Sequence, residues 1–244
     1  MTSVILLPGL ACDAALWRDQ LPALSARHTV RVSTVHERHA DLPSMARALL
    51  AEHAGPLVLV GSSMGGMLAL HAHREAPERI VALALLSSTA RADTPALIKL
   101  RSDAIVEFER GRAEDVLRAN AMFAFHPTHA EDRARVDDYV ANILRVGVAQ
   151  LIAQNRAVMA RADMRPWLTG IGCPLLVACG DGDLLTPPEH SREIAQAVPH
   201  ARFEVVRDAG HLMTWEQPER INALLLQWLA SLQPAVNGAR SPPA

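Results

Sequence analysis

The sequence predicts an α/β fold, in which one mostly parallel sheet of about six strands is flanked by helices and carries a helical insertion. First, short apolar runs alternate with helical patterns over residues 1–90 and again over 168–232. This alternation is typical of right-handed βαβ units in a parallel sheet. Second, Ile80–Leu86 is apolar almost without a break, as in a strand covered on both faces. Third, residues 91–167 contain only helical patterns.

Residues 1–90 form the first part of the predicted core. The strands expected there are Val4–Leu7, Thr29–Val35, Leu57–Val60 and Ile80–Leu86. The helices expected between them are one capped by Asp13 that extends to about Ala26, then Leu42–His53 and Met64–Ala76. Pro77 ends the last of these helices, because proline lacks the N–H that an interior helical position needs.

Residues 91–167 are predicted to form a helical lid or cap. Its clearest pattern runs from Val136 to Ile152, where apolar residues recur close to the i, i+3, i+4, i+7 rule. Gly111, Pro127 and Gly147 punctuate the segment. An insertion between two strands of a parallel sheet stands where a lid over the carboxyl ends of the strands would be placed.

The alternation returns in residues 168–232, the second part of the predicted core. Here the sequence predicts strands at Cys173–Cys179 and Ala201–Val206, and helices at Pro188–Val198 and from about Pro218 to Leu232. The remaining residues, 233–244, are rich in Pro, Gly, Ser and Ala and are predicted to be a flexible tail.

The composition argues against several classes of partner. The net charge of −2 offers no attraction for nucleic acid or an anionic membrane, and no run approaches the ~18 apolar residues of a membrane span. The three cysteines lack the spacing of a metal site or a disulfide framework, which favours a reducing compartment. The first residues resemble no signal peptide. We therefore expect a cytoplasmic protein, and the single lysine among 24 basic residues is typical of a GC-rich bacterial genome.

The segment Gly61-Ser62-Ser63-Met64-Gly65 lies between a predicted buried strand and a predicted helix. It fits the pattern G-x-S-x-G of a nucleophile elbow, a sharp turn that exposes the central serine above the sheet. The chain passes so closely on both sides that only small residues fit. Ser63 would stand near a helix N-terminus, where the dipole favours developing negative charge.

Two further side chains follow strands and could complete a triad with Ser63. In open α/β sheets, ligands bind outside the carboxyl ends of the strands, and both Asp183 and His211 come shortly after one. The imidazole of His211 would take the proton of the serine, and Asp183 would fix the tautomer and stabilise the imidazolium. Asp181, two residues earlier, is the alternative acid.

Four segments, spread from the first strand to the last, carry a resemblance to a known family. They are Leu7-Pro8-Gly9-Leu10, Gly61-Ser62-Ser63-Met64-Gly65-Gly66, Gly180-Asp181-Gly182-Asp183 with Pro187-Pro188, and Ala209-Gly210-His211. In this order the chain resembles the α/β-hydrolase superfamily, specifically its small lidded esterase, lactonase and C–C hydrolase-like members. The resemblance covers residues 1–232.

The resemblance implies roles for particular residues. The backbone N–H groups of Leu10 and Met64 would form the oxyanion hole, and Asp183, last in the Gly-x-x-Asp turn, would be the acid of the triad. Many relatives have His where this chain has Pro8, but the inferred donor is the N–H of Leu10, which the substitution leaves in place.

An apolar pocket for a small substrate is expected beside the triad. The candidate substrate-binding residues are Leu10, Met122, Phe123, Phe125, Leu184 and Leu212. Helical Met and aromatic residues also serve as core, so each of those in the cap has this second interpretation. Cys12 could line the site or be a small buried thiol. His36 and His39 lack a third metal ligand nearby, and we expect them in a solvated loop.

The predicted activity is that of a serine hydrolase, which cleaves a small carboxylic ester, thioester or lactone through an acyl-enzyme. The same triad could instead serve C–C bond hydrolysis or lyase chemistry, or acyl transfer. A receptor that binds a ligand on the same fold without turnover is the non-enzymatic alternative. Neither a cofactor nor a metal is implied, the expected partner is a small-molecule substrate, and the sequence leaves monomer and homodimer open.

Overall fold

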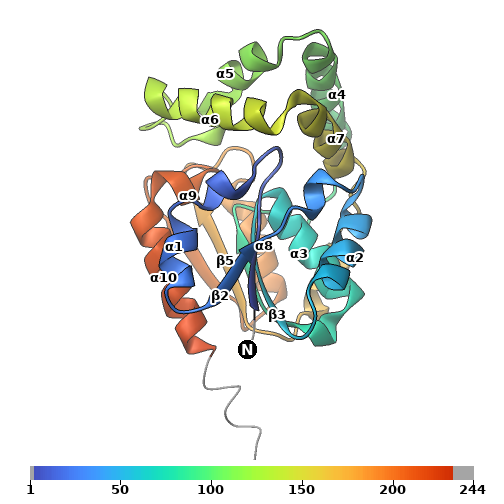
Figure 1. Ribbon diagram of the computed structural model, residues 1–244, viewed down its shortest axis with the longest axis vertical. Helices are drawn as coiled ribbons and strands as arrows, with labels where there is room; N and C mark the ends of the chain where they lie inside the picture. Colours follow the sequence, from blue (N-terminus) through green and yellow to red (C-terminus); the bar gives the residue numbers. More distant parts are fainter. Residues whose placement is uncertain (1–2, 233–244) are drawn as a thin grey trace, which may run out of the picture.

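The computed structural model describes residues 3–232, which include six strands in one parallel sheet of order β2-β1-β3-β4-β5-β6. Figure 1 shows this sheet with helices around it. The strands are β1 (Ser3–Leu7), β2 (Thr29–Val32), β3 (Leu57–Ser62), β4 (Ile80–Leu86), β5 (Leu175–Gly180) and β6 (Arg202–Val206). Every neighbouring pair is parallel. The predicted fold class is confirmed. The predicted tail, 233–244, lies outside the described residues.

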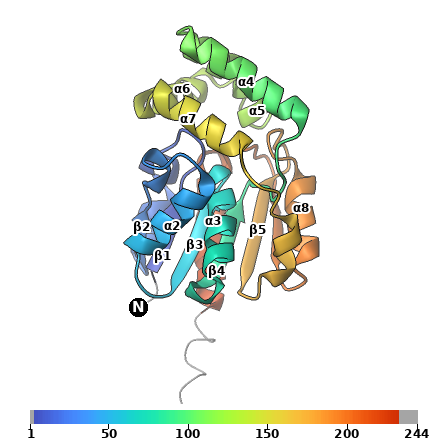
Figure 2. The same ribbon diagram turned by 90° about the vertical axis from the view of Figure 1, so that its right-hand side faces the viewer.

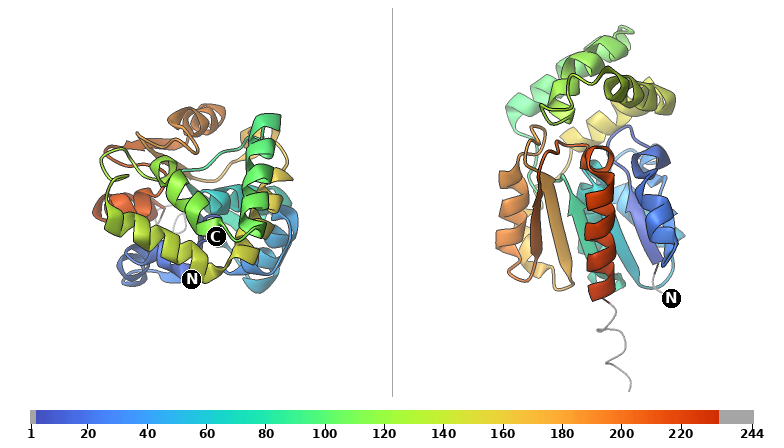
Figure 3. Two further views of the ribbon diagram at one scale, coloured as in Figure 1. Left: turned by 90° about the horizontal axis from the view of Figure 1, so that it is seen from above. Right: turned by 90° about the vertical axis from the view of Figure 1, so that its left-hand side faces the viewer.

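Helices cover both faces of the sheet. They are α1 (Gln20–Ser25), α2 (Leu42–Glu52), α3 (Met64–Glu75), α8 (Pro188–Ala197), α9 (Met213–Glu216) and α10 (Pro218–Ser231). Helices α2, α3 and α8 pack on one face, against a core cluster that includes Leu59 and Leu83. Helices α1 and α10 pack on the other, against Val60 and Ala84 (Figure 3). Successive strand residues point to opposite faces, so β1, β3, β4 and β5 each supply both cores.

Four helices between β4 and β5 lie over the carboxyl ends of the strands (Figures 1 and 2). They are α4 (Pro95–Glu109), α5 (Ala113–Ala124), α6 (Arg133–Val146) and α7 (Val148–Met159). We call these helices and their connections the cap. They enclose most of a further hydrophobic cluster, the cap cluster, which includes Phe108, Leu117 and Ile143 of the cap and also Ala11 from the loop after β1. The domain boundaries at 91 and 167 stay a prediction of the sequence.

A buried ion pair fastens the two ends of the cap. Arg161, just after α7, pairs at 2.8 Å with Asp93, just before α4, and the two side chains are 6% and 1% exposed. Arg101 also contacts Asp93, at 2.9 Å. Burial lowers the pKa of Arg161, while the Asp93 carboxylate opposes that shift. The segments entering and leaving the cap are therefore held together at its base.

Three predicted elements differ from the structure by more than a shift of one or two residues at an end. The helix expected from Asp13 to Ala26 is a 3₁₀ turn, η1 (Ala14–Trp17), followed by α1. Asp13 does cap its start by accepting from the Ala15 N–H at 2.8 Å. Pro22 explains the interruption, because in a continuous helix its ring would clash with the carbonyl four residues earlier.

The other two differences also have local causes. The strand expected over Thr29–Val35 ends at Val32, and the 3₁₀ turn η2 (Val35–Glu37) follows it. The helical pattern from Val136 to Ile152 belongs to two helices, because Gly147 adopts φ +107° between α6 and α7. Two further 3₁₀ turns, η3 (Pro77–Arg79) and η4 (Arg165–Gly170), precede β4 and β5. Within residues 3–232, no helix has both the length and the apolar character to cross a membrane.

Candidate active site

Ser63 occupies the sharp turn between β3 and α3. Its φ of +53° and ψ of −116° are rare for a residue with a side chain, and such strained conformations cluster at functional sites. The flanking glycines are required sterically. A Cβ at Gly61 would overlap the Gly65 carbonyl, and a Cβ at Gly65 would overlap the carbonyl of Leu7. The G-x-S-x-G segment thus has the geometry of an elbow.

Strand β4 holds this turn from one side. The Ser63 N–H donates to the Leu86 carbonyl at 2.9 Å, and the Ser88 hydroxyl donates to the Ser63 carbonyl at 2.8 Å. Ser88 is buried and lies just beyond the end of β4. Ser88 was not predicted, because a serine after a strand carries no signal that distinguishes it from an ordinary turn residue.

A chain of hydrogen bonds joins the three candidate triad residues. The Ser63 hydroxyl lies 2.8 Å from His211 Nε2, and His211 Nδ1 lies 3.0 Å from each carboxylate oxygen of Asp183. With Nδ1 protonated, His211 donates to Asp183 and accepts from Ser63. Asp181 makes different contacts: it accepts from the Ala209 N–H at 3.3 Å and lies 3.8 Å from His126 Nε2. Of these two aspartates, only Asp183 contacts the His211 ring.

The Asp183 carboxylate is 1% exposed and is surrounded by donors. It accepts from the Leu185 N–H at 3.0 Å, from the Thr186 N–H at 2.9 Å and from the Thr186 hydroxyl at 2.9 Å. Burial raises the pKa of Asp183. The electrostatic interaction with His211 and the hydrogen bonds from His211 and Thr186 lower this pKa by more than burial raises it. The net pKa therefore lies below its ordinary value of 3.8. Asp183 is ionised and oriented. Thr186 was not predicted.

The predicted oxyanion donors lie on two segments that meet at Ser63. Met64 is the first residue of α3, so its N–H has no acceptor within the helix. We call residues 8–12 the oxyanion loop. It packs directly on the elbow, since a Cβ on Gly9 would stand 3.4 Å from Ser63 Cβ. Leu10 is the next residue. Its role, and that of Met64, stays a prediction.

The six candidate pocket residues occupy different environments. Met122, Phe123 and Leu184 are exposed by 57%, 39% and 53%, a high exposure for large apolar side chains. Leu10 is partly buried and packs against the cap cluster as well as the core. Leu212 is buried, with 6% exposure, next to His211.

Phe125 does not have a substrate-facing surface in this structure. Its side chain is 0% exposed, belongs to the core cluster on the α10 side of the sheet and makes an edge-to-face contact with Tyr139 at 5.7 Å. We therefore assign Phe125 to the core, which corrects its inclusion among the substrate-binding candidates. Phe125 directly follows α5, and the second interpretation given for the cap candidates, a place in the core, applies to it.

The expectation of a solvated position is wrong for His36, whereas His39 is partly exposed. The His36 side chain is buried, and its Nε2–H donates to the Cys12 carbonyl at 2.8 Å. Burial lowers the pKa of His36. Among the described residues, no group of three or more His, Cys, Asp and Glu side chains could hold a metal. Cys12 is buried as well, and burial raises the pKa of its thiol to about 12.

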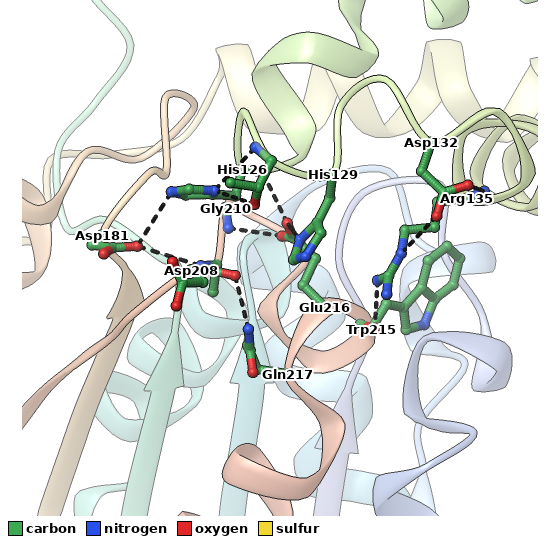
Figure 4. Close-up of polar contacts among 12 residues, drawn as sticks. His126, His129, Asp132, Arg135, Asp181, Asp208, Gly210, Trp215, Glu216 and Gln217 are labelled. Carbon is green, nitrogen blue, oxygen red and sulfur yellow. Dashed lines mark hydrogen bonds and ion pairs between the residues drawn. The ribbon is translucent and has the colours of Figure 1, made fainter.

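A second buried carboxylate, that of Glu216, lies beneath the loop that carries His211 (Figure 4). It accepts from the backbone N–H groups of Gly210 and His126, each at 2.8 Å, and from His129 Nδ1 at 3.0 Å. Its side chain is 0% exposed, so these donors replace water around the charge. Glu216 thereby joins the His211 loop to the segment that follows α5.

The same junction includes direct backbone bonds to the candidate histidine. The carbonyl of Ala124, the last residue of α5, accepts from the N–H of His211 at 3.0 Å and of Leu212 at 3.2 Å. Gly210 is close-packed there, since a Cβ on it would overlap the His126 N–H. The cap therefore supports the position of His211. Sequence reasoning missed Glu216, because 90 residues separate it from His126.

Replacement of Glu216 by alanine is expected to destabilise the fold. It would leave the buried N–H of Gly210 and the part-buried N–H of His126 without acceptors, at about 1–3 kcal/mol each. We expect the free energy of unfolding to fall by roughly 2–6 kcal/mol, as measured by urea denaturation. Glu219→Ala, at an exposed position three residues later, is the control and should change it by less than about 0.5 kcal/mol. Equal midpoints for the two variants would contradict this role of Glu216.

Comparisons with known proteins agree with this architecture. A family model described as alpha/beta hydrolase fold matches residues 40–218. RutD of Enterobacter cloacae, whose name proposes a carbamate hydrolase, is 27% identical over 247 residues that cover 94% of this chain and 91% of RutD. A thermophilic esterase from Thermogutta terrifontis, solved with malate bound, superposes with a TM-score of 0.86 at 26% identity and covers 95% of this chain and 90% of its own.

The enol-lactonase of Burkholderia xenovorans LB400 shares the fold, with a TM-score of 0.84 at 23% identity over 94% of this chain and 91% of its own. The family model spans well over half of the sequence, from before β3 to the start of α10, and includes the elbow and both of the other candidate triad residues. The chain therefore belongs to the alpha/beta hydrolase fold family.

Proposed function

We propose that this protein is a serine hydrolase that cleaves a small carboxylic ester, thioester or lactone through an acyl-enzyme. The observation that carries the proposal is the unbroken hydrogen-bond chain from Asp183 through His211 to the Ser63 hydroxyl, at 3.0 and 2.8 Å. A serine hydroxyl is a weak nucleophile until a base takes its proton, and this chain supplies an oriented base.

In the proposed reaction, His211 Nε2 removes the Ser63 proton as Oγ attacks the substrate carbonyl. The negative oxygen that develops would accept hydrogen bonds from the N–H groups of Leu10 and Met64. Asp183 stabilises the imidazolium, which then protonates the leaving alcohol. In the second half, His211 activates a water molecule that hydrolyses the acyl-enzyme and restores the serine.

The exposed apolar side chains favour a substrate with an apolar acyl or alcohol group. Phe123 directly precedes Ala124, whose carbonyl accepts from the backbone N–H of His211, and Leu184 directly follows Asp183. Both are more exposed than large apolar residues usually are. We assign Met122, Phe123 and Leu184, together with Leu10 and Leu212, to substrate binding.

Carbamate hydrolysis is the second candidate, because RutD, whose name proposes it, aligns over 94% of this chain. A carbamate presents the same carbonyl to Ser63 but carries nitrogen on one side. The same three residues could also serve C–C bond hydrolysis or acyl transfer, in which an alcohol replaces water at the acyl-enzyme. The cytoplasmic location stays part of the proposal.

A panel of substrates tests the reaction class. It contains p-nitrophenyl esters of increasing acyl length, a p-nitrophenyl carbamate and a dienone C–C substrate, each assayed with the wild type and with Ser63→Ala as a blank. We expect the highest kcat/KM for one of the esters. If only the carbamate or only the dienone were turned over, ester hydrolysis would be rejected as the activity of this site.

A further inference from the structure

Gln154 is a fully buried amide on α7 of the cap, 143 residues away in sequence from the group it contacts in the core. Its Oε1 accepts from the N–H of Ala11 at 2.7 Å. Its Nε2 donates to the His36 carbonyl at 3.1 Å and to Gln150 Oε1 at 3.2 Å. Because both amide hydrogens have acceptors, the orientation that turns Oε1 toward Ala11 is fixed.

A second set of bonds closes a ring around the oxyanion loop. The buried His36 donates through Nε2 to the Cys12 carbonyl at 2.8 Å, and Gln150 donates to the Glu37 carbonyl at 2.8 Å. Helix α7 thus holds the turn η2, the turn η2 holds the oxyanion loop at Cys12, and Gln154 holds the same loop directly at Ala11. Each bond lies in a part-buried or buried setting, where it competes little with water.

The oxyanion loop is also packed into the cap. Ala11 is 0% exposed and belongs to the cap cluster around Phe108 and Ile143, and Leu10 packs against that cluster. Arg145 of α6 forms an ion pair with Asp13, just after the loop. One side of the loop therefore contacts the elbow through Gly9, and the opposite side is part of the core of the cap.

Ala11 needs such support because of its backbone. Its φ is +52°, a left-handed conformation that disfavours residues other than glycine. The N–H of Ala11 belongs to the peptide unit between Leu10 and Ala11. A hydrogen bond to this N–H fixes the orientation of that peptide unit, which directly follows the Leu10 N–H in the chain. Without the acceptor at Gln154 Oε1, a buried N–H would be unpaired and the plane could rotate.

We propose that Gln154 is a positioning residue, which keeps the oxyanion loop in the conformation that points the Leu10 N–H at the substrate oxygen. This inference rests on the proposed function. By this inference the cap supports the oxyanion hole. Displacement of α7 would remove the hydrogen bond that orients the oxyanion loop. The hydrogen bonds that join Ser63, His211 and Asp183 to one another would stay in place.

The test uses Gln154→Met, which keeps the length of the side chain but removes its acceptor. Asn155→Leu is the matched control, because Asn155 is also buried on α7 but bonds to Arg101 and the Leu151 carbonyl, not to the loop. For the best ester, we expect Gln154→Met to lower kcat by about 10- to 100-fold with KM changed less than about threefold. For Asn155→Leu we expect less than about a threefold loss.

A thionoester separates positioning from a general loss of structure. Sulfur accepts hydrogen bonds poorly, so the ratio of kcat/KM for the oxygen ester to that for its thionoester reports on the oxyanion donors. This ratio is independent of the fraction of enzyme that is folded. We expect it to fall in Gln154→Met by about the same factor as kcat, and to stay at the wild-type value in Asn155→Leu.

Gln154→Asn, which shortens the side chain by one methylene, provides a milder variant in which the ratio should also fall. An unchanged ratio in an active Gln154 variant would overturn the role of Gln154. A wild-type enzyme that hydrolyses neither the ester nor the thionoester, and that a fluorophosphonate probe does not label at Ser63, would instead overturn the proposed function. The two failures are therefore distinguishable.

Discussion

Ser63→Ala is expected to lower kcat/KM for the best ester by about 10⁴-fold or more, because it removes the atom that would form the acyl-enzyme. KM should change little, since the hydroxyl contributes to chemistry rather than to the apolar contacts of the substrate. Steady-state assays on p-nitrophenyl esters measure both constants. The variant should fold normally, because the Ser63 hydroxyl contacts His211 and bears none of the bonds that hold the turn.

Ser62→Ala is the matched control for this prediction. Ser62 is the last residue of β3, is 4% exposed and precedes the apex of the elbow. We expect its removal to change kcat/KM by less than about tenfold, since it takes no part in the proposed chemistry. Two results would contradict the assignment of Ser63: a Ser63→Ala enzyme that keeps about a tenth or more of wild-type kcat/KM, or a Ser62→Ala enzyme that loses nearly all of its activity.

Asp183→Asn is expected to lower kcat by about 10⁴-fold. This magnitude is the one known for the corresponding aspartate of a serine protease triad, where asparagine stabilises the wrong tautomer of the histidine. Asp181→Asn should cost less than about tenfold, because Asp181 contacts Ala209 and lies near His126 instead of His211. A larger loss for Asp181→Asn than for Asp183→Asn would reverse the assignment of the acid.

The lowered pKa of Asp183 also predicts how stability depends on pH. A carboxyl group whose pKa is lower in the folded state stabilises the fold above its unfolded pKa, and this contribution is lost as the pH falls through the folded pKa. Below about pH 4, wild-type stability should therefore fall more steeply than that of Asp183→Asn. Denaturant titrations between about pH 2 and 5 measure the two slopes.

Much of the fold was predictable because parallel strands leave a strong pattern in sequence. Strands buried on both faces are nearly continuous apolar runs, and Ile80–Leu86 coincides with β4 residue for residue. The element boundaries failed where one residue changes the local geometry. Pro22 interrupts the first predicted helix, and Gly147 divides a pattern that looks continuous when only apolar spacing is read.

The candidate site was predictable only in its local parts. The elbow needs small residues at fixed positions, and the turns that carry Asp183 and His211 follow apolar strands, so each leaves a short motif. Gln154 and Glu216 leave none. Their partners are 143 and 90 residues away in sequence, and an isolated glutamine or glutamate on a helix looks like an ordinary surface residue until the helices are placed.

Covalent trapping tests the central claim, that Ser63 is the activated nucleophile, most directly. The folded protein is incubated with a fluorophosphonate probe, and its intact mass and then its labelled peptide are measured. We expect a single adduct, located on Ser63 and absent from Ser63→Ala, with Ser62→Ala labelled like the wild type. No adduct on the folded protein, or an adduct on another residue, would contradict the account.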